Sequence, residues 1–156
     1  MKKILVMALA IFCTTGCVTA PKLNTSSGTP EIEITTSLEK LSDYLVARGI
    51  ESGYQVKSQT KNSLIFERAD TSFGAKIMFG SKARRTPNRR LEFNFYQKDP
   101  ATVKVRATCG MVTNPGTGLE EFSDLSASAS RTQDFLLNIR ARLEGLGSGD
   151  KEPMMP

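Results

Sequence analysis

The sequence predicts an α+β fold, a two-layer sandwich in which two helices pack on one antiparallel sheet of about five strands. Two segments with helical spacing of apolar residues, at about 37–48 and 131–144, enclose a region in which apolar and polar residues alternate. Helices with one apolar side and a sheet with one apolar face would bury these surfaces against each other. Residues 31–146 are therefore expected to form a single domain.

Both predicted helices have start and stop signals. Residues 36–39 and 130–133 fit capping boxes, in which a Ser or Thr starts the helix and a Glu or Gln reaches back to it. Gly49 and Gly145 are typical helix stops. The apolar faces consist of Leu38, Leu41 and Leu45 in the first helix and of Phe135, Leu136, Ile139 and Leu143 in the second.

The strands are predicted from alternation between apolar and polar residues. The expected strands are 54–58, 63–68, 73–79, 91–96 and 103–109, with 31–34 as a candidate short edge strand. Residues 117–129 read as a long connection whose Leu119, Phe122 and Leu125 could serve as buried anchors.

The last two predicted strands constrain each other's register. A three-residue loop would place Phe95 opposite Val103 and keep the apolar residues of both strands on one face. A two- or four-residue loop would mix the faces. The pattern therefore favours an odd loop, and it places Cys109 on the core side.

The first seventeen residues have the composition of a secretory signal peptide. Two lysines precede an apolar run, Ile4 to Phe12, and small residues follow it. The run is far shorter than the roughly 20 residues that span a bilayer, so a transmembrane helix is the weaker interpretation. A plain cleavage site at 18–20 would place Pro21 directly after the cut, and Cys13 follows the bulky Phe12.

Thr14-Thr15-Gly16-Cys17 resembles the lipobox of bacterial lipoproteins, with Thr14 in place of the usual Leu. This resemblance covers residues 1–17 only. It implies a signal peptide at 1–16, a diacylglyceryl thioether on Cys17 and acylation of the new amino group. Two or more acyl chains anchor a protein stably to a membrane. Val18 resembles the class sorted to the outer membrane, with the inner membrane or secretion as alternatives.

The segments on either side of the domain are polar. Residues 17–30 are expected to be a tether, and the thirteen residues after Cys17 would reach at most about 45 Å when extended. Residues 147–156 are expected to be a disordered tail. The order of elements is similar in outline to the helix-grip domains of some envelope lipoproteins, an analogy that does not fix function.

Composition excludes several classes of function. Removing Lys2 and Lys3 lowers the net charge from +5 to +3, a mild excess that does not indicate nucleic-acid binding. The chain has no His, so Ser-His-Asp and Cys-His catalysis and the usual zinc hydrolase sites are excluded. It has no CxxC motif, and Cys109 would be the one thiol left after lipidation of Cys17. We expect no metal and no cofactor.

Two clusters of charge are candidate contact sites. The basic cluster consists of Lys82, Arg84, Arg85, Arg89 and Arg90. It is either a solvated loop or a contact for an anionic surface, such as phospholipid, lipid A phosphate or a partner protein. The acidic cluster consists of Glu120, Glu121 and Asp124, which are either solvated charges near the second helix or groups that bind a cation or face the basic loop of a partner. We predict a lipid-anchored periplasmic module for binding or assembly, with a small cell-wall-active enzyme using carboxylates as the alternative.

Overall fold

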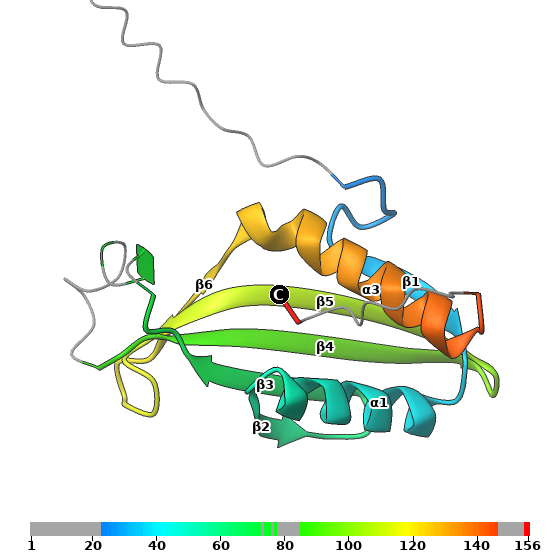
Figure 1. Ribbon diagram of the computed structural model, residues 1–156, viewed down its shortest axis with the longest axis horizontal. Coiled ribbons are helices and arrows are strands. Elements are labelled where there is room, and N and C mark those ends of the chain that lie inside the picture. Colours follow the sequence, from blue (N-terminus) through cyan, green and yellow to red (C-terminus); the bar gives the residue numbers. More distant parts are fainter. Residues whose placement is uncertain (1–22, 73, 76, 78–84, 147–154) are drawn as a thin grey trace, which may run out of the picture.

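The structure, a computed structural model, describes residues 23–72, 74, 75, 77, 85–146, 155 and 156. It is an α+β fold, as predicted (Figure 1). The elements in chain order are β1 (Glu31–Thr35), α1 (Leu38–Glu51), β2 (Gln55–Gln59), β3 (Ser63–Ala69), β4 (Asn88–Asp99), β5 (Thr102–Thr113), β6 (Glu121–Asp124), the 3-10 turn η1 (Ser126–Ser128) and α3 (Ala129–Leu143).

The described strands form one antiparallel sheet of six strands rather than about five. Their order is β1-β5-β4-β3-β2, and β6 also pairs with β5. β1 pairs with residues 102–106 of β5, whereas β6 pairs with residues 110–113. These two short strands therefore share one edge of β5, each along its own half.

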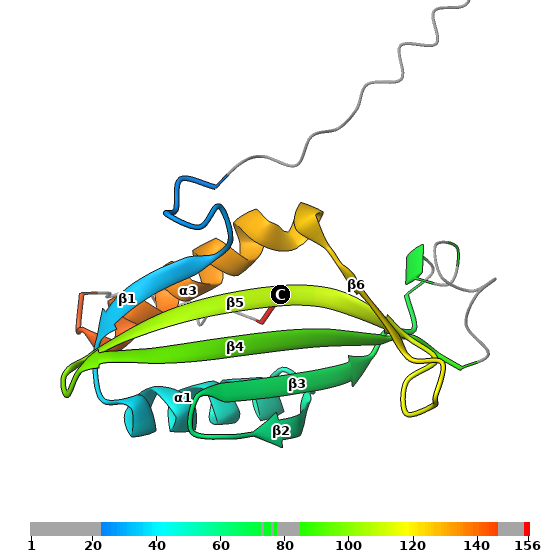
Figure 2. The same ribbon diagram turned by 180° about the vertical axis from the view of Figure 1, so that it is seen from behind.

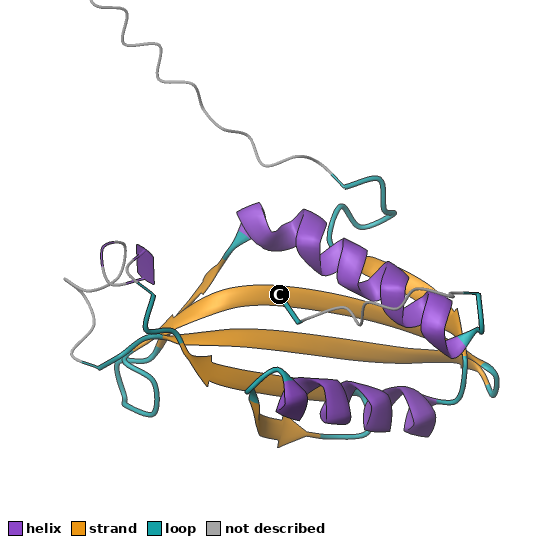
Figure 3. Cartoon of the chain, viewed as in Figure 1, coloured by secondary structure: helices purple, strands orange, loops and turns teal. Residues whose placement is uncertain are grey.

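Both helices cover the same face of the sheet (Figures 1 and 3). The apolar residues of the strands point toward them, among them Ile34, Leu64, Phe66, Leu91, Phe93, Val103 and Val105, all fully buried. The helices contribute Leu41, Leu45, Phe135, Leu136 and Ile139 to the same core. The opposite face, which we call the open face, has no helix over it within the described residues (Figure 2).

Helix α1 runs past its predicted stop. The Ser37 hydroxyl accepts a hydrogen bond from the Lys40 amide at 3.2 Å, so the helix begins close to the predicted position. The cap is Ser37 rather than Thr36, and Lys40 stands three residues after it, so the capping box predicted at 36–39 does not form. Gly49 does not end it, and that prediction is wrong. A Cβ at Gly49 would lie 2.4 Å from Phe66 Cε1, so glycine is needed there for the close approach of helix and sheet. The chain turns instead at Gly53, whose φ is +78°.

The β4–β5 hairpin has a different register from the predicted one. Phe95 lies opposite Val105 rather than Val103, because a two-residue turn replaces the expected three-residue loop. The pairing shifts between Gln97 and Asp99, and this bulge restores the alternation that a two-residue turn alone would have broken. The prediction that Cys109 lies on the core side of its strand is confirmed, since Cys109 is 4% exposed.

Two predictions about the remaining strands are corrected. Most of the predicted strand 73–79 lies outside the described residues, but Gly74, Ala75 and Ile77 are helical. The Ser72 hydroxyl accepts from the Ala75 amide at 3.3 Å, a contact typical of a helix start. Residues 121–124, expected within a connection, form β6. Leu119 is not a buried anchor, because it is 71% exposed.

The second capping box does not form. Helix α3 starts at Ala129, and its N-cap Ser128 makes no side-chain cap bond. Gln133 instead binds the backbone of Glu31. Of the predicted tail, residues 147–154 lie outside the described part. Met155 is buried in the core, and the Tyr54 hydroxyl donates to the Pro156 carbonyl. The C-terminal end therefore lies over the helix-covered face of the sheet (Figure 1).

Candidate functional site

The described members of the basic cluster do not act together. Lys82 and Arg84 lie outside the described residues. Arg89 and Arg90 are neighbours in β4, so their side chains point to opposite faces of the sheet. Arg89 pairs with Asp70 at 3.0 Å, whereas Arg85, just before β4, is exposed.

Arg90 is the centre of an ion-pair cluster on the open face. Its side chain is 14% exposed and contacts three carboxylates, those of Glu67, Glu120 and, at 4.0 Å, Glu92. The Nε–Oε1 distance to Glu67 is 2.8 Å, and Nη2 lies 2.6 Å from Glu120 Oε1. The guanidinium also lies 5.9 Å from the centre of the Phe122 ring. Burial lowers the pKa of Arg90, but the bonds to Glu67 and Glu120 outweigh this and raise it.

Glu120 holds the 114–120 loop to the sheet. One of its oxygens accepts from the Gly116 amide at 2.9 Å, and the other accepts from Arg90. The bond from Gly116, followed by the bond from Arg90, lowers the pKa of Glu120. Glu120 therefore stays ionised near neutral pH. Of the other acidic candidates, Glu121 and Asp124 are exposed at the two ends of β6.

A cleft of about 660 Å³ adjoins this cluster. The start of β2, the end of β3 and two loops line it, through Gly53, Gln55, Val56, Lys57, Glu67, Arg68, Ala69, Arg85, Thr86, Asn88, Pro115 and Gly116. Its one lining carboxylate, among the described residues, is Glu67, which already contacts Arg90. The three lining cations therefore leave the cleft with an excess of positive charge.

The three cations differ in how firmly they are held. Arg68 donates to the Ser52 carbonyl at 2.7 Å and lies 4.5 Å over the Tyr54 ring. Lys57 is half exposed, and its Nζ is 3.9 Å from Glu67. Arg85 has no ion-pair partner in the described part of the chain. Lys57 and Arg85 are therefore the cations best able to bind a ligand in the cleft.

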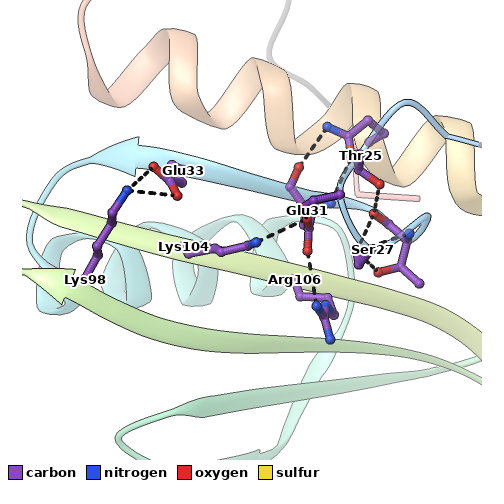
Figure 4. A network of polar contacts seen from close by, with 10 residues as sticks. Thr25, Ser27, Glu31, Glu33, Lys98, Lys104 and Arg106 are labelled. Carbon is purple, nitrogen blue, oxygen red and sulfur yellow. Dashed lines mark hydrogen bonds and ion pairs between the residues drawn. The ribbon is translucent and has the colours of Figure 1, made fainter.

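The far half of the open face carries a second polar network (Figure 4). The Glu31 carboxylate accepts from Ser26 and lies 3.2 Å from both Lys104 Nζ and Arg106 Nη2. The Ser26 bond is the largest cause that lowers the pKa of Glu31 to about 2. Lys98 pairs with Glu33 at 3.2 Å. A hollow of about 420 Å³ nearby is lined by Asn94, Phe95, Tyr96, Lys104 and Arg106. Its two cations, Lys104 and Arg106, both contact the single Glu31 carboxylate.

The sequence did not single out Glu67, Lys57 or Arg68. Glu67 is a charged residue at the end of an apolar strand, a weak signal by itself. Its role depends on the pairing of β3 with β4, which places Glu67 opposite Arg90. That register was not predicted.

No family model, curated protein or solved structure matches this chain. Within the described residues, we find no helix with the length and apolar character needed to cross a membrane. The same residues contain no group of three potential ligands that could hold a metal ion. Any proposal about function must therefore be argued from the side chains of this chain alone.

Proposed function

We propose that this protein is a lipid-anchored periplasmic protein of the outer membrane whose domain is a non-enzymatic binding module. The leader and Cys17 support the anchoring. The observation that supports binding is the cleft at the end of the open face, with the exposed cations Lys57 and Arg85. Its partner is an acidic segment of an envelope protein.

Charge complementarity is the basis of this choice. Glu67 and Glu120, the acidic groups nearest the cleft, are already bound by Arg90. An incoming carboxylate would therefore meet Arg85 and also Lys57, whose contact with Glu67 is a long one, at 3.9 Å. Such charges at the rim of a site steer a partner of opposite charge and select against others.

The alternative, a cell-wall-active enzyme, has less support. Hydrolysis of a glycosidic bond by two carboxyl groups needs one that stays protonated near neutral pH as the general acid. Among the described carboxyl groups, those with a clearly shifted pKa are Glu31, Asp70 and Glu120, and all three pKa values are lowered. Each is bound by serine, arginine or backbone groups that favour the ionised form.

The anchor is tested with the full-length protein and a Cys17→Ser variant in a bacterial host. We expect wild type to incorporate labelled fatty acid and to sediment with membranes, and Cys17→Ser to do neither. A Cys17→Ser protein that remains on membranes, with wild type unlabelled, would contradict lipidation.

The cleft is tested with a fluorescent acidic peptide rich in Asp and Glu, measured by anisotropy. Replacing both Lys57 and Arg85 with Gln should weaken binding by roughly two- to thirtyfold, since an exposed ion pair contributes about 0.2–1 kcal/mol. The matched control, Lys61→Gln with Lys98→Gln, removes two charges elsewhere and should bind like wild type. Equal affinities for all three proteins would refute the site. Binding to anionic vesicles instead of the peptide would identify lipid as the ligand.

A further inference from the structure

Residues 23–30, the part of the predicted tether that the structure describes, are bound to the domain. Residues 23–29 form a turn in which the Gly28 amide donates to the Thr25 carbonyl at 3.1 Å, and the Thr25 hydroxyl donates to the Thr29 carbonyl at 2.7 Å. Ser26 donates to Glu31, and the Pro30 carbonyl accepts from the Ala107 amide at 2.9 Å. Asn24 also lines a hollow together with Gln133 and Leu137 of α3, so the chain joins the domain at Asn24, well before residue 30.

This junction limits how far the domain can stand from a bilayer. Seven residue steps separate Cys17 from Asn24. A fully extended chain of that length spans at most about 25 Å, compared with about 45 Å for a tether that reaches to residue 30. The bound holds for any conformation of the connecting residues. The surface beside Asn24 must therefore stay close to the membrane.

The surface at the junction combines an exposed apolar side chain with cations. A hollow of about 300 Å³ brings together the turn, β1 and α3. Leu137 of α3 lines this hollow and is 40% exposed, because it lies outside the buried face of the helix. Arg140 of α3 lines the same hollow. Lys104 of β5 and the Glu31 and Glu33 carboxylates also line it, but Lys104 is paired with Glu31 at 3.2 Å and Glu33 is paired with Lys98.

We propose that this surface, formed by Leu137 and Arg140, rests on the anionic phospholipid surface to which Cys17 is anchored. The inference depends on the proposed lipidation of Cys17. An apolar side chain beside a cation suits the headgroup region, where the apolar group enters the boundary and the cation binds a phosphate. The cleft is lined by Asn88, the first residue of β4. The start of β4 and the strand β1 lie toward opposite ends of the sheet (Figures 1 and 2), so the cleft is left free for its partner.

The test measures which end of the anchored domain lies near lipid. Single cysteines replace Leu137, beside the junction, or Leu119, which is 71% exposed in the loop next to the cleft. Both are made with Cys109→Ala, labelled with an environment-sensitive fluorophore and studied as lipidated protein in vesicles of phosphatidylethanolamine and phosphatidylglycerol. Lipids carrying a headgroup spin label should quench the probe at position 137 several-fold more than the probe at 119.

A lengthened tether is the matched control. A Gly/Ser insert of about twenty residues after Thr19, whose coil averages about 25 Å, should reduce the difference between the two probes. Equal quenching at both positions in the short-tethered protein, or stronger quenching at 119, would overturn the proposed orientation while leaving the anchor intact. If the purified protein carries no lipid on Cys17, it is the proposed anchor that fails.

Discussion

At the scale of single residues, the Arg90 cluster makes the clearest energetic prediction. Glu67 and Arg90 are both largely buried, with side chains 8% and 14% exposed. Arg90→Gln would leave Glu67 buried without its main partner. Loss of one member of a buried pair costs about 3–5 kcal/mol, and we expect the lower end because Asn88 still donates to Glu67. Urea denaturation of the purified protein measures this change.

Two controls accompany that variant. Lys98→Gln removes an exposed pair with Glu33 and should change the free energy of unfolding by about 1 kcal/mol or less. The double variant Glu67→Gln with Arg90→Gln should recover part of the loss, because no buried charge remains. If Arg90→Gln is no more harmful than Lys98→Gln, the cluster does not stabilise the fold.

The lowered pKa of Glu31 predicts that the folded protein loses stability in acid. Its folded-state pKa of about 2 lies below the ordinary value of 4.5, so the folded state favours the ionised form. The resulting stabilisation is complete above the unfolded pKa and is lost as the pH falls from about 4.5 toward 2. In Glu31→Gln, the urea midpoint should fall less steeply over this range. Glu39→Gln, an exposed control in α1, should keep the wild-type slope.

At the scale of elements, helix α3 closes one edge of the sheet. The Gln133 side-chain oxygen accepts from the Glu31 backbone amide at 2.9 Å, and the Gln133 side-chain nitrogen donates to the Glu31 backbone carbonyl at 3.1 Å. Glu144, just after the helix, accepts from the Thr35 amide at 2.7 Å. Backbone groups of β1 that would face an added strand are thus bound by side chains, a protection against edge-to-edge association.

Gln133→Ala tests this edge protection by hydrogen exchange. Loss of two hydrogen bonds of about 1 kcal/mol each should speed exchange of the Glu31 amide severalfold or more. The interior β1 amide of Ile34 should change less. Asn138→Ala, which removes a bond only to the Asp134 carbonyl in the same helix, should leave the Glu31 amide unchanged. Unaltered exchange in Gln133→Ala would show that the edge is protected by other means.

At the scale of the whole molecule, Cys109 should report global unfolding. It is buried in β5, which pairs with β1, β4 and β6, and burial raises the pKa of its thiol. In a protein with Cys13→Ser and Cys17→Ser, Cys109 is the one thiol. The free energy of opening derived from its labelling rate should fall with urea concentration with the same slope as the free energy of global unfolding. An added Leu146→Cys, at a 72% exposed site, should label at once in the folded protein. Fast labelling of Cys109 without urea would indicate local opening of the sheet.

Patterns within a segment predicted most of the elements, because they depend on neighbouring residues. The alternation in 91–96 and 103–109 and the helical spacing of 37–48 and 131–144 specified which faces are apolar. The same patterns could not show that the helix continues past Gly49, since that glycine is required by the close approach of Phe66 in β3. Nor could they give the bulge near Asp99, because the alternation favours an odd loop and does not show that an extra residue in one strand lets a two-residue turn keep the faces in step.

The sequence by itself determined the α+β class, the apolar faces of the strands and helices, and the lipobox-like leader. These follow from composition and spacing along the chain. Only the tertiary structure decided which charges meet. It separated Arg89 from Arg90, paired Arg90 with Glu67 and Glu120, and left Arg85 exposed beside the cleft. Contacts between residues far apart in sequence depend on strand order and register, which packing of the whole core selects.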